Sequence, residues 1–126
     1  MADGMPLGVE TRYLPSGEIT AEAVANADAL MIRSVTRCDR TLLGGSAVRL
    51  ITSATAGFDH IDTEYCREAG IRWFNAPGCN AASVAQYVLT AISRIALEQG
   101  LAPGDITLGI IGTGHTGGRV YQRAKA

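Results

Sequence analysis

Short apolar runs alternate along this chain with segments that have helical patterning. The runs have the length of β-strands, and turn-forming residues follow most of them. The pattern predicts strands at residues 29–35, 48–54 and 71–75, and residues 8–14 are compatible with another short one. The run at 29–35 is apolar almost throughout, which is typical of a strand covered on both faces in a parallel sheet.

The segments between the runs begin at residues that can cap a helix. We expect helices at residues 19–27, 39–43, 62–68 and 81–99, capped by Thr20, Asp39, Asp62 and Asn80. The helix at 81–99 carries Val84, Val88, Ile92 and Ile95 along one side, and further apolar residues widen this surface. Such a surface fits a core helix, or a helix that also packs against a second domain or subunit.

Strands that alternate with helices indicate α/β architecture with a parallel sheet and right-handed crossovers. We predict a parallel-sheet, flavodoxin-like substrate domain over residues 1–104, which includes the helix at 81–99. The Pro103-Gly104 turn then leads into residues 105–126, where we expect the first strand, loop and helix of a Rossmann domain.

Composition narrows the functional classes. Of 126 residues, 47% are hydrophobic and 18% charged, which is enough for a compact core and excludes a disordered chain. The net charge of -1 and the scattered basic residues argue against a nucleic-acid or anionic-membrane surface. Without a signal sequence, a membrane span or a C-x-x-C pair, we expect a reduced, cytoplasmic protein with no metal site.

The most informative motif lies in residues 106–120, where an apolar run breaks into a glycine turn and restarts as a helix. Gly112, Gly114 and Gly117 have the spacing G-x-G-x-x-G. Gly112 would permit the tight turn, Gly114 the approach of a pyrophosphate, and Gly117 the packing of helix on strand.

Backbone amides at the start of that helix, around His115, Thr116 and Gly117, would point at phosphate oxygens. The alternative is a glycine-rich turn without a ligand. An acidic residue about 20 positions further on usually holds the ribose of a dinucleotide, and the sequence stops at Ala126 before that position.

Polar groups follow each predicted strand, at the edge where ligands bind in open parallel sheets. Arg33 and Ser34 could offer a cation and a hydroxyl to an anionic substrate, although Arg33 could equally pair with a carboxylate. The backbone of Thr55, Ala56 and Gly57 could present amides to a carboxylate, or could form an ordinary turn.

Three other residues have a simpler interpretation. His60 lies near two aspartates, as an oriented base would, but we favour a hydrogen bond to loop backbone. Cys79 has no evident base partner, so a nucleophilic role is not expected, and Trp73 is most simply a core residue.

Taken together, residues 24–119 resemble the D-2-hydroxyacid dehydrogenase family. The segments that carry the resemblance are residues 27–36, 53–62, 76–81, 84–88 and 109–117. The resemblance implies that Ser34 and Thr55 supply substrate-binding hydroxyls and that Ala56 and Gly57 hold the substrate carboxylate. It also implies that residues 112–117 bind NAD and that the helix at 81–99 lies at a domain junction and dimer interface.

The combination of A-T-A-G-x-D-H-x-D with A-P-G-C-N-A resembles a narrower branch of that family. This narrower resemblance implies oxidation of the 2-hydroxyl of 4-phospho-D-erythronate in pyridoxal phosphate biosynthesis, by an intact enzyme that is a cytoplasmic homodimer. Another family activity, of the phosphoglycerate or glyoxylate/hydroxypyruvate type, is the first alternative. A non-catalytic fragment or dimerising module is the second.

This sequence departs from the family's pattern at several points. Gln86 stands where the family commonly has Glu, and a first strand and helix are not evident before Gly8. The family's catalytic Arg, Glu and His would lie beyond Ala126. We therefore expect an N-terminal piece of the enzyme, without catalytic residues of its own, that turns over no substrate alone.

Overall fold

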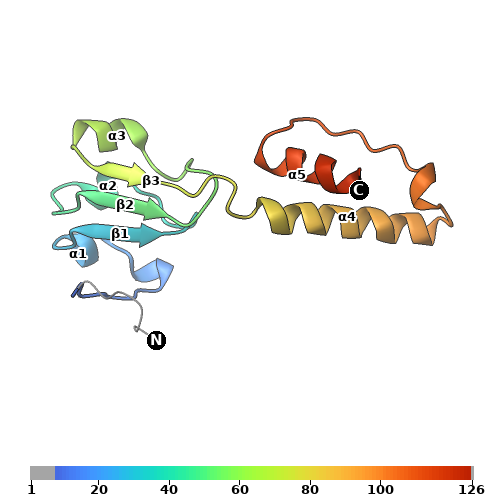
Figure 1. Ribbon diagram of the computed structural model, residues 1–126. Helices are drawn as coiled ribbons and strands as arrows, with labels where there is room; N and C mark the ends of the chain where they lie inside the picture. The colour runs from blue at the N-terminus through green and yellow to red at the C-terminus, as the bar shows by residue number, and fades with distance from the viewer. Residues whose placement is uncertain (1–7, 126) are drawn as a thin grey trace. The chain divides into compact units, whose positions relative to one another are not determined.

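The computed structural model describes residues 8–125 and contains a three-stranded parallel sheet (Figure 1). The sheet order is β1-β2-β3, and helices connect the strands. The elements in chain order are η1 (Ser16–Glu18), α1 (Ala21–Val24), β1 (Ala29–Ile32), α2 (Arg40–Leu43), β2 (Leu50–Ser53), α3 (Thr63–Glu68), β3 (Arg72–Phe74), α4 (Ala81–Glu98), η2 (Pro103–Asp105) and α5 (His115–Ala124). The predicted α/β class with a parallel sheet is confirmed.

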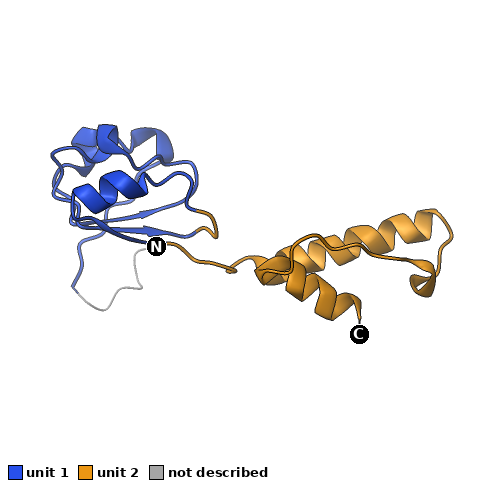
Figure 2. Ribbon diagram, turned by 90° about the horizontal axis from the view of Figure 1, so that it is seen from above, with its two compact units in different colours: residues 1–54, 58–74 blue, residues 55–57, 75–126 orange. Residues whose placement is uncertain are grey.

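The chain divides into two compact units (Figure 2). The first contains the sheet with α1 to α3, up to Ala54 and again over Phe58–Phe74. The second contains Thr55–Gly57 together with the chain from Asn75 onward. This division follows packing, so the domain boundary predicted at residue 104 stays a prediction.

Three short helices of the first unit begin where the sequence places their caps. The Thr20 hydroxyl accepts a hydrogen bond from the Ala23 amide, and the Asp62 carboxylate accepts one from the Tyr65 amide. Asp39 accepts from two amides, those of Thr41 at 2.9 Å and Leu42 at 3.3 Å. Each cap satisfies donors that would otherwise have no partner in the first turn.

One face of the sheet carries the core of the first unit. Alternate strand residues point to this face, and α1, α2 and α3 contribute Val24, Leu42, Leu43 and Cys66 to the same buried cluster. Ile51, in the central strand, is completely buried. The opposite face behaves differently: Met31 and Phe74 flank Thr52 in register, and they are 71% and 57% exposed.

Several expectations about strands were wrong. β1 is not covered on both faces by the described residues, because Met31 lies on the open face. Residues 8–14 form no strand. Residues 106–111 are not a strand either, since none of the described strands pairs with them.

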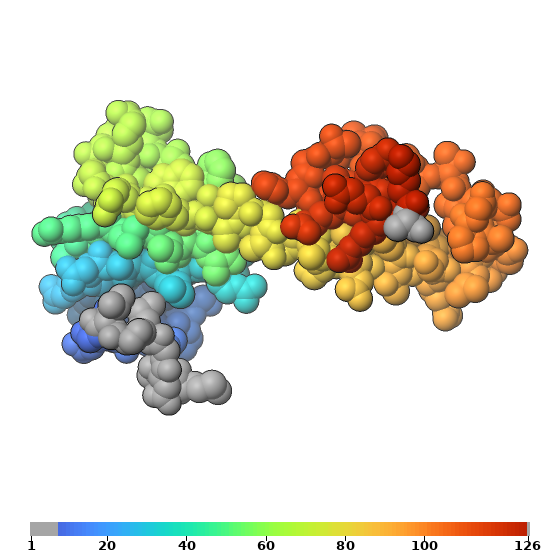
Figure 3. Space-filling model, in the orientation of Figure 1, coloured from blue at the N-terminus to red at the C-terminus, as the bar shows by residue number. Residues whose placement is uncertain are grey.

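In the second unit, α5 packs along α4 (Figure 3). The fully buried positions of α4 are the alanines Ala81, Ala85 and Ala96, and α5 contributes the buried Val120. Small side chains allow two helices to approach closely. The larger predicted apolar side is only partly covered, and Ile95 and Tyr87 are exposed. No described helix is both long and apolar enough to cross a bilayer.

Candidate functional site

The three residues Thr55–Gly57, which follow β2, form a loop whose carbonyl groups all have partners. The Thr55 carbonyl accepts a hydrogen bond from the Ala76 amide at 2.8 Å. The Ala56 carbonyl accepts one from Nδ2 of Asn75 at 2.8 Å, and the Gly57 carbonyl accepts one from the Thr55 hydroxyl at 2.7 Å. These bonds fix the orientation of successive peptide groups.

The amides of Ala56 and Gly57 differ from these carbonyls in their hydrogen bonding. Neither donates a hydrogen bond to any other group among residues 8–125. In a trans peptide the carbonyl and the following amide point in opposite directions, and no peptide bond in the described chain is cis. Holding the two carbonyls therefore turns both amides away from the protein groups that hold them, and this leaves the amides available to an anionic ligand.

The glycine turn, residues 112–117, has the geometry that the motif predicts. Gly112 has φ of 87°, a conformation that glycine adopts far more readily than other residues. A side chain on Gly117 would overlap the Gly112 carbonyl oxygen, so the helix passes too close for any other residue. A side chain on Gly114 would meet nothing within 4 Å, which leaves that backbone open to a ligand.

Helix α5 begins within this segment, at His115. Its first intrahelical bond runs from the Gly118 amide to the Gly114 carbonyl. The amides of His115, Thr116 and Gly117 precede that bond and have no acceptor within the helix. With the helix dipole they form a cradle suited to phosphate oxygens.

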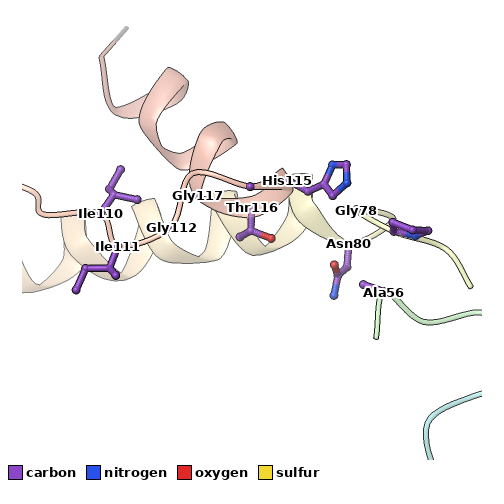
Figure 4. Close-up of a pocket in the computed structure, with 11 residues that line it drawn as sticks. Ala56, Gly78, Asn80, Ile110, Ile111, Gly112, His115, Thr116 and Gly117 are labelled. Atoms are coloured by element: carbon purple, nitrogen blue, oxygen red, sulfur yellow. The ribbon is translucent and has the colours of Figure 1, made fainter. Parts of the chain in front are cut away.

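A cavity of 550 Å³ joins these features within the second unit (Figure 4). Its lining includes Ala56 of the 55–57 loop, the Pro77-Gly78 bend with Asn80, Ile110 and Ile111, and the glycine turn with Thr116. His115 lies against Gly78, where an added Cβ would be 2.9 Å from the imidazole Cγ. Gly78 also has φ of 74°, so both space and backbone favour glycine there.

Two asparagines, Asn75 and Asn80, lie at the candidate site although the sequence did not single out their side chains as site residues. Asn75 holds the 55–57 loop, although its position after a strand and before a proline gave only a general indication of a polar edge. Asn80 stands at the N-cap position of α4, but its side chain makes no capping bond and it lines the cavity. The predicted capping role of the Asn80 side chain was therefore wrong.

The predicted residues after β1 belong to the first unit. Arg33 and Ser34 are both exposed, and Arg33 forms no ion pair with any described residue. The Thr55 hydroxyl donates to the Gly57 carbonyl, so it shapes the loop. The substrate-binding roles of Ser34, Thr55 and Arg33 stay predictions.

His60 is buried, and its Nε2 lies 2.8 Å from the hydroxyl oxygen of Ser53. Its hydrogen-bond partner is thus a side chain of β2, not the loop backbone we favoured. Nδ1 of His60 is also buried and has no partner among the residues that the structure describes. Within residues 8–125, no aspartate is hydrogen-bonded to this imidazole.

Two of the three cysteines, Cys38 and Cys66, are buried. Burial, followed by the neighbouring Cys66 and Asp39, raises the pKa of the Cys38 thiol to about 11. Burial and Asp62 also raise the pKa of Cys66, and Cys79 is an exposed free thiol. Within residues 8–125 no three His, Cys, Asp or Glu side chains gather as metal ligands would. Trp73 packs against the core and stacks on Phe58, with ring centroids 5.0 Å apart.

Comparison with known proteins gives consistent matches. Residues 6–122 match the profile of the D-isomer specific 2-hydroxyacid dehydrogenase catalytic domain. The erythronate-4-phosphate dehydrogenase of Bacteroides fragilis is 53% identical over 116 residues, which are 92% of this chain and 33% of that protein. That of Klebsiella pneumoniae is 44% identical over 117 residues, 93% of this chain and 31% of the relative. The chain thus spans a third of the length of these curated relatives.

Solved structures agree in fold. A 3-phosphoglycerate dehydrogenase from Entamoeba histolytica with bound NAD+ has a TM-score of 0.64 at 28% identity, over 90% of this chain and 39% of that one. A D-lactate dehydrogenase from Aquifex aeolicus, in complex with NAD and lactic acid, has a TM-score of 0.66 at 22% identity. The latter match covers 86% of this chain and 39% of that structure.

Proposed function

The chain belongs to the D-isomer specific 2-hydroxyacid dehydrogenase family, and we propose that it forms the N-terminal third of an enzyme that oxidises the 2-hydroxyl of 4-phospho-D-erythronate with NAD. The single observation that carries this proposal is the shared cavity. Ala56 and the glycine turn line the same space, and within residues 8–125 neither the Ala56 amide nor the Gly57 amide donates a hydrogen bond. A hydroxy acid held by its carboxylate and a dinucleotide held by its pyrophosphate would then lie close together, as hydride transfer requires.

The residues of this chain fit such a cofactor. The open backbone at Gly114 and the amides of His115, Thr116 and Gly117 would hold the pyrophosphate. NAD held there would supply the acceptor for the hydride that leaves C2 of the substrate. The amides of Ala56 and Gly57 would bind the carboxylate and orient C2. On the family resemblance alone, we also propose substrate-binding roles for Ser34, Thr55 and Arg33.

The substrate assignment rests on the curated relatives. Identity of 53% over nearly the whole chain to an erythronate-4-phosphate dehydrogenase favours that activity over the phosphoglycerate type, for which the structural match is 28% identical. On the same basis we propose a role in pyridoxal phosphate biosynthesis, a cytoplasmic location and a homodimeric intact enzyme. We also propose that the proton-transfer group lies outside these residues, so that the chain alone turns over no substrate.

A second candidate function is a dimerising module without catalysis. It is favoured by the exposed apolar residues of α4, among them Tyr87 and Leu97. Light scattering and NAD titration of the purified chain separate the two functions. A dimer that binds no NAD favours the module.

A chimera tests the main proposal. The chain is joined to the C-terminal remainder of the Bacteroides fragilis relative, and NADH formation is followed with 4-phospho-D-erythronate, 3-phospho-D-glycerate or D-glycerate. We expect turnover with phosphoerythronate and none from the chain by itself. A preference for another acid would overturn the substrate, and an active chain by itself would overturn the predicted dependence on further residues.

A further inference from the structure

We propose that Asn75 is the positioning residue that sets the anion-binding orientation of the 55–57 loop. This inference rests on the proposed function, because it concerns how the carboxylate of the 2-hydroxy acid is held. The side-chain amide of Asn75 donates to the Ala56 carbonyl at 2.8 Å in a partly buried setting. It is the only side chain outside the loop that holds a loop carbonyl within the described residues.

Asn75 holds the peptide that joins Ala56 to Gly57. Its carbonyl and its amide point in opposite directions. While Asn75 binds the carbonyl, the Gly57 amide is held on the other side, where it has no protein acceptor among the described residues. Without Asn75 the peptide could rotate, and glycine at position 57 makes that rotation easier than any other residue would.

Rotation would have two consequences for a bound carboxylate. The loop would lose a charge-assisted hydrogen bond from the Gly57 amide. It would also turn the Ala56 carbonyl oxygen toward the anion, where two acceptors repel each other. The neighbouring peptide keeps a backbone anchor, because the Ala76 amide still holds the Thr55 carbonyl. Asn75 thus controls one specific peptide and not the whole loop.

Nδ2 of Asn75 touches the loop backbone, and we assign it no contact with the reacting atoms. Its loss should therefore change substrate binding more than the chemical step. In the chimera described above, we expect Asn75→Leu to raise KM for the acid about 10- to 100-fold, the range expected for one lost hydrogen bond to a charged group. We expect kcat to change less than about threefold and KM for NAD to stay the same, because uniform binding of the acid is what is lost.

Three variants make the test specific. Asn75→Leu removes the donor without adding charge, and Asn75→Asp removes it while keeping the shape. Asn26→Leu is the matched control, since Asn26 is exposed after α1 in the first unit. Thermal unfolding of each variant of the chain, followed by the circular dichroism of its helices, of which the longest, α4 and α5, lie in the second unit, shows that the variant is folded. If Asn75→Asp raises KM but Asn75→Leu does not, electrostatic repulsion explains the effect and the inference is overturned.

A second measurement uses the chain itself and separates this inference from the proposed function. The ¹⁵N–¹H signals of Ala56 and Gly57 are followed during titration with D-erythronate, which has the carboxylate but no phosphate, and with inorganic phosphate. We expect D-erythronate to shift both amides in the unaltered chain, and Asn75→Leu to move the free Gly57 signal and abolish its response. Phosphate should affect the glycine turn instead.

The outcomes are distinct. If the unaltered chimera oxidises no 2-hydroxy acid, the proposed function fails, and the position of the Gly57 signal then decides the inference. A Gly57 signal that is the same in Asn75→Leu and the unaltered chain would overturn it, as would a KM for the acid within twofold of the unaltered chimera.

Discussion

Residues 106–111 and strand β2 are both apolar runs, but they have different structures. Both contain adjacent aliphatic residues, Ile110-Ile111 in one and Leu50-Ile51 in the other. Ile51 is completely buried between β1 and β3, whereas Ile111 is fully exposed. Ile106 already has extended backbone, with φ of -95° and ψ of 123°. An apolar run can therefore set an extended conformation, but it becomes a strand only when neighbouring strands satisfy its backbone groups.

The difference also separates the two halves of the candidate site. The 55–57 loop is held by hydrogen bonds that Asn75 and Ala76 donate to its carbonyl groups. The glycine turn follows an unpaired run, although its own glycine geometry is complete. The 55–57 loop is therefore fixed by hydrogen bonds from residues distant in sequence, whereas the glycine turn is fixed mainly by its local backbone geometry.

The largest expected effect is on hydrogen exchange, when residues 106–111 are supplied with strands that can pair with them. In the chimera that adds the remainder of the Bacteroides fragilis relative, we expect this run to become a strand. Hydrogen exchange of the amides at 107–110 should slow by about a hundredfold or more, because exchange then requires opening of a sheet. Equal exchange rates in the chain and the chimera would contradict the Rossmann assignment.

The next effect compares the same substitution in the two runs. Ile51→Ala should lower the free energy of unfolding of the first unit by about 2–5 kcal/mol, because it leaves a cavity in the core. Ile111→Ala should change the free energy of unfolding of the second unit by less than about 0.5 kcal/mol, as at other exposed sites. Urea unfolding followed by the fluorescence of Trp73, the single tryptophan, measures the first unit, and far-ultraviolet circular dichroism of α4 and α5 measures the second. Similar losses from the two variants would show that the runs are equivalent after all.

The smallest effect concerns a helix cap in the first unit. Partial burial acts to raise the pKa of Asp39, but the amides of Leu42 and Thr41 and the Arg37 guanidinium together lower it below 3.8. The stability contribution of a carboxylate with a lowered pKa is full above the unfolded pKa and is lost as the pH falls through the folded one. Asp39→Ala should cost about 1 kcal/mol near neutral pH, by loss of the cap.

Asp39→Asn is the matched control, because asparagine caps helices comparably but does not titrate. We expect Asp39→Asn to keep most of the stability near pH 7. Below pH 3.8 it should not show the loss of stability that protonation of Asp39 causes in the unaltered chain. Urea midpoints measured from pH 2 to 7 on the three proteins provide the comparison. An unchanged pH dependence in Asp39→Asn would assign the acid sensitivity to another group.

Features set by local sequence were predictable. Thr20, Asp39 and Asp62 cap the helices that follow them. The spacing of Gly112, Gly114 and Gly117 predicted a turn and the close approach of a helix. Features set by distant partners were not. Asn75 and Ala56 are 19 residues apart, and only the pairing of β2 with β3 places the end of one strand beside the loop after the other. The exposure of Met31 likewise depends on which elements cover the sheet.

The three helices of the first unit have four, four and six residues. Helices this short are not stable in isolation, even with good caps. Ala29 pairs with Leu50, and Leu50 with Arg72, so each strand pair must also enclose a whole connecting segment before any sheet hydrogen bond forms. We infer that nothing in this unit can nucleate locally. During synthesis its nascent chain should stay unstructured until β3 has left the ribosome, and it should then fold in one comparatively slow step.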